Sequence, residues 1–175
     1  MEIVTVDHPR AGVLRRRAKP VGRVTGELQR LIDNMIEAMR EANGAGLAAP
    51  QVGVGRRLFV AEVEERVHVV IDPQIVKMEG EEVGSEGCLS IPGIVADVPR
   101  AQRVVLKGKN RKGRGITLDA EGLLARVIQH EVDHLDGVLF LDRVVDRSTI
   151  REVTATTEVE PAGPAEPAEP TAAGG

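Results

Sequence analysis

The sequence predicts an α+β fold in which antiparallel β-strands pack around a central helix, with a further helix near the N-terminus. Three observations favour this fold class. Only two segments have apolar residues at helical spacing, and they lie far apart in the sequence. The segments between them contain short runs rich in Val and Ile, bounded by Gly and by charged turns. Strands and helices do not alternate regularly, as they would in a parallel α/β fold.

The N-terminal helix is predicted over residues 25–43. Thr25 is a candidate N-cap, and Asn43-Gly44 is a typical helix end. One face carries apolar residues at the i, i+3, i+4, i+7 spacing. These residues are Leu28, Leu31, Ile32, Met35, Ile36 and Met39. This face is expected to pack on the core.

Two hairpins are predicted between the helices. Their strands span residues 57–63, 66–71, 103–107 and 115–118. The first pair turns at Glu64-Glu65, and its second strand is expected to end at Asp72-Pro73. The second pair turns at residues 108–113, a charged segment bounded by glycines.

The second helix is predicted over residues 121–136, ending at Gly137, and Val138 to Val145 is a final strand candidate. One side of the helix carries Leu123, Leu124, Val127, Ile128, Glu131 and Leu135. The other side carries Arg126, Gln129 and Asp133. This distribution predicts one apolar face and one polar face.

The chain is long enough for one domain, which we place at residues 1–150. Residues 151–175 are rich in Pro, Ala and Glu and poor in large apolar side chains, so they are expected to form a disordered tail. Aromatic residues make up only 1% of the chain, so the core must be aliphatic.

Charge and cysteine content restrict the class of protein. The five glutamates and one arginine that follow Ser148 account for the net charge of −4, which leaves a nearly neutral body and no basic domain for DNA. A single cysteine excludes an internal disulfide framework. No secretory leader and no apolar run long enough to span a membrane are present, so a cytoplasmic location is expected.

An H-E-x-x-H motif lies on the second predicted helix, at residues 130–134. Two histidines four residues apart share one helix face, so His130 and His134 can bind one metal ion. Glu131 then projects beside the metal as a candidate general base. The alternative is a pair of surface histidines, but the motif continues the apolar face that carries Leu123 and Val127.

A catalytic metal site usually needs a third protein ligand. The longer metzincin motif would place a histidine where this chain has Phe140. A thermolysin-like site would use a downstream glutamate, but those are Glu152 and residues of the predicted tail. Cys88 is the better candidate, on the E-G-C-L-S segment between Gly84 and Pro92, which reads as irregular.

Other readings of these residues remain open. Cys88 could be a nucleophile with a histidine base, although Glu131 would then have no role. H-E-x-x-H alone also favours a small zinc endopeptidase. A structural metal module, or an RNA-binding adaptor that uses Lys107 to Arg114, is the non-enzymatic alternative. An open site with an adjacent glutamate argues against both of these.

Three segments together resemble the peptide deformylase family: G-x-G-L-A-A-P-Q at residues 44–51, E-G-C-L-S at 86–90 and Q-H-E-x-D-H at 129–134. Their order and spacing match, and the resemblance covers residues 2–147. It implies a metal-dependent amide hydrolase that removes the N-formyl group from the formylmethionine of new polypeptides and releases formate.

The resemblance also implies roles for individual residues. The metal ligands would be Cys88, His130 and His134, with Glu131 as base. The Gln51 side chain and the Leu89 backbone N–H would bind the oxyanion. Gly44 and Gly46 would lie against the substrate, and Leu123 and Val127 would line a methionine pocket. The implied native ion is Fe²⁺, and the ligand chemistry also suits Zn²⁺, Ni²⁺ or Co²⁺.

The implied partners are N-formylmethionyl nascent peptides and the ribosome near its exit tunnel, with no DNA or membrane partner. The chain departs from many relatives in two places. They continue into a long C-terminal helix, whereas Asp146 to Glu152 would form about two helical turns. They also often carry an aromatic or basic residue where this chain has Ile94-Val95-Ala96.

Overall fold

The computed structural model describes residues 1–154. It contains the helices α1 (Gly26–Glu41) and α2 (Gly122–Leu135) and the short 3-10 helices η1 (Ala11–Arg15), η2 (Ala49–Val52), η3 (Phe140–Arg143) and η4 (Arg147–Thr149). Its strands are β1 (Gly46–Ala48), β2 (Leu58–Val63), β3 (Arg66–Glu79), β4 (Glu82–Cys88), β5 (Ile91–Arg100), β6 (Arg103–Lys109), β7 (Gly115–Glu121) and β8 (Arg151–Glu152). Residues 155–175, most of the predicted tail, lie outside this description.

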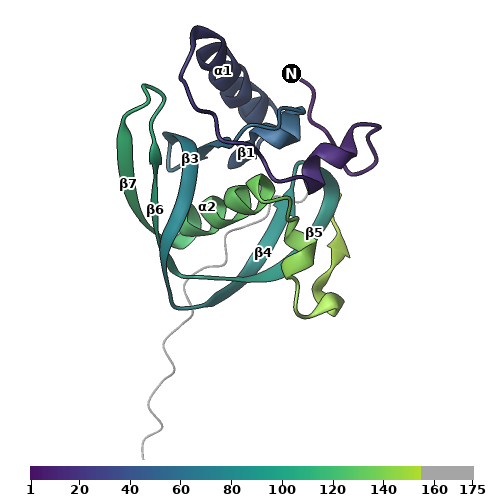
Figure 1. Cartoon of the computed structure of the whole chain (residues 1–175). Coiled ribbons are helices and arrows are strands. Elements are labelled where there is room, and N and C mark those ends of the chain that lie inside the picture. The colour runs from purple at the N-terminus through teal and green to yellow at the C-terminus, as the bar shows by residue number, and fades with distance from the viewer. Residues whose placement is uncertain (155–175) are drawn as a thin grey trace, which may run out of the picture.

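The strands form two antiparallel sheets. One sheet has the order β1-β2-β3-β6-β7, and the other has the order β4-β5-β8. Figure 1 shows α2 at the centre of the molecule, between the strands of the two sheets. The prediction of an α+β fold with antiparallel strands is therefore confirmed. Within residues 1–154, no helix is long and apolar enough to cross a membrane.

Helix α1 covers the outer face of the five-stranded sheet near β1 and β2. Its buried residues, Leu28, Ile32, Met35 and Met39, pack with Leu58 and Val60 of β2 in one aliphatic cluster. The side chain of Thr25 accepts a hydrogen bond from Leu28 N–H, which caps the first turn. The predicted helix and its N-cap are thus present at the expected place.

Helix α2 is buried on nearly all sides, including the side that carries its polar residues. Gln129 and Asp133 are buried, whereas Leu123, assigned to the apolar side, is 60% exposed. The two sheets enclose the helix, so its polar side chains must find partners inside the protein. Gln129 does so by hydrogen bonding to the backbone N–H and C=O of Ala101.

Strands β4 and β5 are the main elements that the sequence does not predict. Two glycines interrupt β4, and two prolines and a glycine interrupt β5, which obscures the alternation expected of a strand. The strand β3 also continues past Asp72-Pro73, where the sequence predicts its end. A register shift between Ile71 and Gln74 accommodates the proline, which has no N–H to donate to the ladder.

The segment Val138 to Val145 is not the predicted final strand. It contains the 3-10 helix η3, and its aromatic residue Phe140 is buried in a cluster with Leu14 and Val98. The last strand is instead β8, which lies within the range assigned to the tail and pairs with Ile94 and Val95 of β5. An exposed two-residue strand of this kind gives no periodic signal in the sequence.

Candidate metal centre and active site

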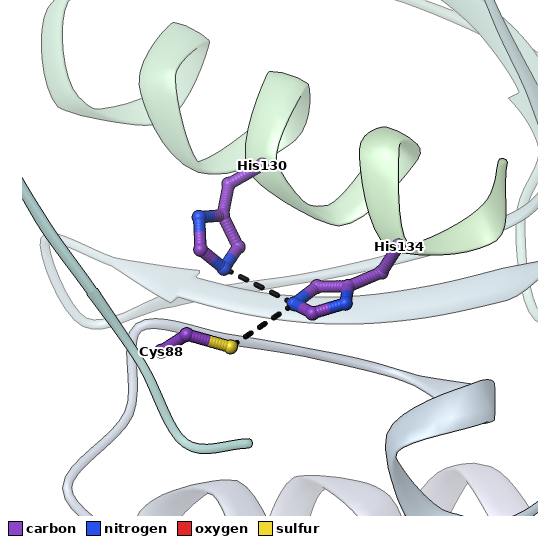
Figure 2. A group of neighbouring side chains, drawn as sticks. All are labelled: Cys88, His130 and His134. Atoms are coloured by element: carbon purple, nitrogen blue, oxygen red, sulfur yellow. Dashed lines mark hydrogen bonds between the residues drawn. The ribbon is translucent and has the colours of Figure 1, made fainter. Parts of the chain in front are cut away.

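Three side chains converge at one end of α2. The Nε2 atom of His134 lies 3.2 Å from the Sγ of Cys88 and 3.2 Å from the Nε2 of His130 (Figure 2). The three potential ligand atoms all lie within 4.8 Å of one another. One thiol and two imidazoles at this separation form a donor set that suits a tetrahedral metal with one open position.

The local structure explains this convergence. His130 and His134 are one helical turn apart on α2, so their side chains leave the same face of the helix. Cys88 is the last residue of β4, and the register with β5 shifts between Gly87 and Cys88. Cys88 thus lies at an irregularity at the end of a strand and not in the middle of an element, as predicted, although the strand itself was not predicted. The shift redirects the chain at the point where the thiol meets the histidines.

Glu86 supports the histidine that stands next to it. Its carboxylate accepts a hydrogen bond from His130 Nδ1 at 2.8 Å and two from Arg100, at 2.8 and 2.9 Å. Burial alone would raise the pKa of Glu86, but the hydrogen bonds from Arg100 and His130 outweigh it and lower this pKa to about 2. Because the Glu86 carboxylate occupies Nδ1 of His130, the Nε2 atom of this histidine is free to bind a metal.

A buried ionic network lies behind Glu86 and is absent from the sequence prediction. Arg100 bridges Glu86 and Asp133, with a 2.6 Å contact to Asp133. Asp133 also accepts hydrogen bonds from Arg143 at 2.9 and 3.1 Å. Arg126 donates to Glu86 at 2.8 Å. In the sequence, the only sign of this network is Asp133, the acidic residue inside H-E-V-D-H. Its burial becomes apparent only in the fold.

Glu131 lies beside the three candidate ligands and is 3% exposed. Burial raises its pKa to about 7, with His130 lowering it and Glu86 raising it. Among the described residues, neither Oε2 of Glu131 nor Nδ1 of His134 has a hydrogen-bond partner. A buried carboxylate oxygen without a partner is available to a water molecule or a substrate.

Gly46 packs directly against Glu131. A Cβ atom at position 46 would lie 2.8 Å from the Cδ and 2.9 Å from the Cγ of Glu131, and closer still to Oε1. Any larger residue would therefore displace the carboxylate. The sequence does not predict this contact, because it suggests only that the glycines leave room for a ligand. A Cβ atom at position 44 would likewise lie only 2.7 Å from Cδ1 of Leu89.

The Gln51 side chain is fixed at the same site. Its Oε1 accepts a hydrogen bond from Ala48 N–H at 2.9 Å. Its amide nitrogen points at Ser90 Oγ, 3.2 Å away, and at Cys88 Sγ, 3.6 Å away. Gln51 is 1% exposed, so this orientation is set by the protein and not by solvent. The amide N–H group is thus held next to the candidate metal ligands.

A cavity of about 490 Å³ opens beside these residues. Its walls include every residue that the sequence assigns to substrate binding and the oxyanion: Gly44, Gly46, Gln51, Leu89, Leu123 and Val127. Cys88, His130 and Glu131 also reach it. Its size falls within the range of about 300–1,000 Å³ typical of ligand pockets. Three convergent ligands, a buried glutamate and an adjacent cavity are typical of metal-dependent hydrolases.

Comparisons with known proteins agree with this class. The family model described as polypeptide deformylase matches residues 1–149. The peptide deformylase of Thermodesulfovibrio yellowstonii is 50% identical over 137 residues, which are 75% of this chain and 83% of that protein. The peptide deformylase of Dictyoglomus turgidum is 46% identical over 152 residues, covering 87% of this chain and 97% of its own length.

Solved structures give the same result. The crystal structure of peptide deformylase from Thermus thermophilus superimposes with a TM-score of 0.76 at 50% identity, over 81% of this chain and 84% of that one. The enzyme from Synechococcus elongatus in complex with actinonin gives a TM-score of 0.81 at 45% identity, over 85% and 81%. This chain belongs to the polypeptide deformylase family. It is a metal-dependent hydrolase that removes the formyl group from the N-terminal methionine of nascent polypeptides.

Proposed function

We propose that the chain carries out this hydrolysis at a single divalent metal held by Cys88, His130 and His134, with Glu131 as the general base. The observation that carries the proposal is the convergence of the three ligand atoms next to a buried glutamate at the wall of the cavity. We also propose residues 1–150 as the catalytic domain, since they would supply every group that the reaction needs.

The residues fit a metal in two respects. The Glu86 carboxylate orients His130 from its Nδ1 side, an arrangement common behind metal-binding histidines. The Nε2 of His134 lies beside both Cys88 Sγ and His130 Nε2, so this imidazole can act as a ligand of the same ion. A bound ion would lower the pKa of water and polarise the formyl carbonyl.

Glu131 performs the proton transfers. It takes a proton from the attacking water, whose oxygen adds to the formyl carbon. Glu131 then gives the proton to the leaving amine as the C–N bond breaks, so the products are formate and a free N-terminus. Its carboxyl group is buried at the cavity wall, next to the place where both the water and the leaving amine would lie.

Gln51 and Leu89 stabilise the negative charge that develops on the formyl oxygen. The Gln51 amide is already oriented by Ala48 N–H, so it loses no freedom when the charge forms. In other enzymes one well-placed donor of this kind contributes about 3–4 kcal/mol. The Leu89 backbone N–H is the second donor, on the segment that follows Cys88.

The methionine side chain is bound by the wall that α2 contributes to the cavity. Leu123 and Val127 are one turn apart on α2, and Gly44 and Gly46 line the same cavity. The glycines allow the substrate backbone to approach closely. An extended apolar side chain can therefore lie between α2 and the glycine segment.

We propose Fe²⁺ as the native ion and the cytoplasm as the location, where nascent chains emerge from the ribosome. A thiolate with two imidazoles also accepts Zn²⁺, Ni²⁺ or Co²⁺, so ligand chemistry alone leaves the ion open. Metal analysis of protein purified without oxygen identifies it. Iron is supported if the metal content is mainly iron and if air inactivates this form faster than a nickel-substituted one.

The test of the base is Glu131→Gln, which keeps the shape of the side chain and removes its proton transfer. We expect kcat for formyl-Met-Ala to fall by at least ~100-fold while the metal content stays near that of the wild type, because general acid–base catalysis contributes about 10²–10⁴. Glu37→Gln, on the exposed side of α1, is the matched control. Turnover near the wild-type rate in Glu131→Gln would refute the assignment.

A further inference from the structure

The C-terminal strand β8 borders the substrate cavity. Its residues Arg151 and Glu152 pair with Val95 and Ile94 of β5, and Val153 N–H donates to Gly93 C=O at 2.9 Å, which extends the ladder by one residue. Val153 lines the same cavity as the candidate ligands Cys88 and His130. The cavity wall therefore includes a residue that follows the last of the three family motifs in the sequence.

Val153 is half-buried at the cavity, whereas both residues of β8 are exposed. Arg151 donates to Ser85 Oγ of β4 at 2.9 Å, and Ser85 also lines the cavity. Ile94, which pairs with Glu152, lines the cavity as well and packs against the core cluster that contains Phe140.

Val153 lies away from the reacting end of the cavity. The sheet order is β4-β5-β8, and Cys88 is at the end of β4. Neighbouring strands are about 4.8 Å apart, so β8 is about 10 Å from β4. An extended peptide advances about 3.3 Å per residue. A substrate whose formyl group lies at the ligands would therefore reach Val153 with about its third residue.

We infer that Val153, held in place by β8, forms a subsite for the substrate residues that follow the formylmethionine and favours apolar side chains there. This inference rests on the proposed function of the site. The hydrogen bonds of Arg151 to Ser85 and to Thr149 C=O, the latter at 3.0 Å, fix β8 against the rest of the cavity wall. Val153 adds an apolar surface, which the charged and exposed residues of β8, Arg151 and Glu152, do not provide.

The test compares a short substrate with a longer one. Formyl-Met-Ala contains too few residues to reach Val153, whereas formyl-Met-Ala-Leu-Ala reaches it. In Val153→Asp, the backbone hydrogen bonds of β8 remain. We expect kcat/KM for the tetrapeptide to fall about tenfold through a higher KM, the size of effect that a mismatched apolar contact has in other enzymes. We expect kcat/KM for formyl-Met-Ala to stay within about twofold.

Val145→Asp is the matched control, because Val145 is 82% exposed and does not line the cavity. A second pair of variants ends the chain after Ile150, which removes β8, or after Thr154, which keeps it. We expect kcat/KM for the tetrapeptide, relative to that for formyl-Met-Ala, to fall only in the chain that ends after Ile150. The subsite would be overturned if Val153→Asp changed kcat/KM for neither substrate, or changed it equally for both. Absence of deformylation in the unmodified chain would instead overturn the proposed function.

Discussion

At the scale of single residues, the site depends on space as much as on chemistry. Glu131 can occupy its position only because residue 46 has no side chain. A glycine in a loop is usually attributed to backbone freedom, but Gly46 is not among the glycines with positive φ. Its role is to allow the close approach of a carboxylate, which the backbone angles would not reveal.

Gly46→Ala should therefore impair catalysis by moving Glu131. We expect kcat to fall by at least ~10-fold, since displacement of a catalytic group by about 1 Å can cost as much as 100-fold. Steady-state kinetics with formyl-Met-Ala and metal analysis measure the effect. Gly55→Ala is the control, because a Cβ there would meet nothing within 4 Å and should leave kcat unchanged. Equal kinetics in both variants would show that Glu131 tolerates the displacement.

Cys88→Ser tests the third ligand. A hydroxyl is a poorer ligand than a thiolate for iron, zinc, nickel and cobalt, so we expect metal retention to weaken for each of these ions. Dialysis against a chelator followed by metal analysis measures retention without relying on activity. If the variant held stoichiometric metal as tightly as the wild type and still removed formyl groups, Cys88 would be a core residue and the third ligand would lie elsewhere.

At the scale of elements, α2 combines two roles that normally belong to different faces of a helix. It presents His130 and His134 to the candidate metal site and Asp133 to the ionic network behind them. Burial makes this network costly to break, because removing one partner leaves an opposite charge uncompensated. The helix that carries the metal ligands is thus fixed by charges as well as by apolar packing.

Asp133→Ala should lower the free energy of unfolding by about 3–5 kcal/mol, the usual cost of breaking a buried ion pair. Arg100, also buried, would lose its contact at 2.6 Å. Asp136→Ala, which removes a partly exposed pair with Arg57, should cost about 0–1 kcal/mol. Denaturant unfolding at equal metal content compares the two variants. Similar losses in both would mean that the Asp133 network contributes no more than a surface pair.

At the scale of the whole molecule, the described fold ends with β8 beside the cavity. Removal of residues 155–175 should leave the melting temperature within about 2 °C of the wild type, since this segment can bury little apolar surface. Deformylation of formyl-Met-Ala should also be unchanged. Thermal unfolding of the chain ended after Thr154 checks this, and a drop of several degrees would show that the removed residues contribute to folding.

The sequence by itself determined the features that depend on neighbours along the chain. Helical spacing predicts α1 and α2, and four-residue spacing places His130 and His134 on one side of a helix. The three motifs also indicate the family. These signals are strong because a helix is stabilised by contacts within a few residues, so its pattern is visible in a short window of sequence.

Contacts between residues that are far apart in the chain become apparent only in the three-dimensional fold. Cys88 joins a histidine 46 residues away because β4 and α2 pack together, and the broken pattern of β4 and β5 hid both strands. The same packing buries Asp133 between Arg100 and Arg143, places Gly46 against Glu131 and brings Val153 to the cavity. Strand pairing and core packing join residues through space, and the local periodicity of the sequence does not record those partners.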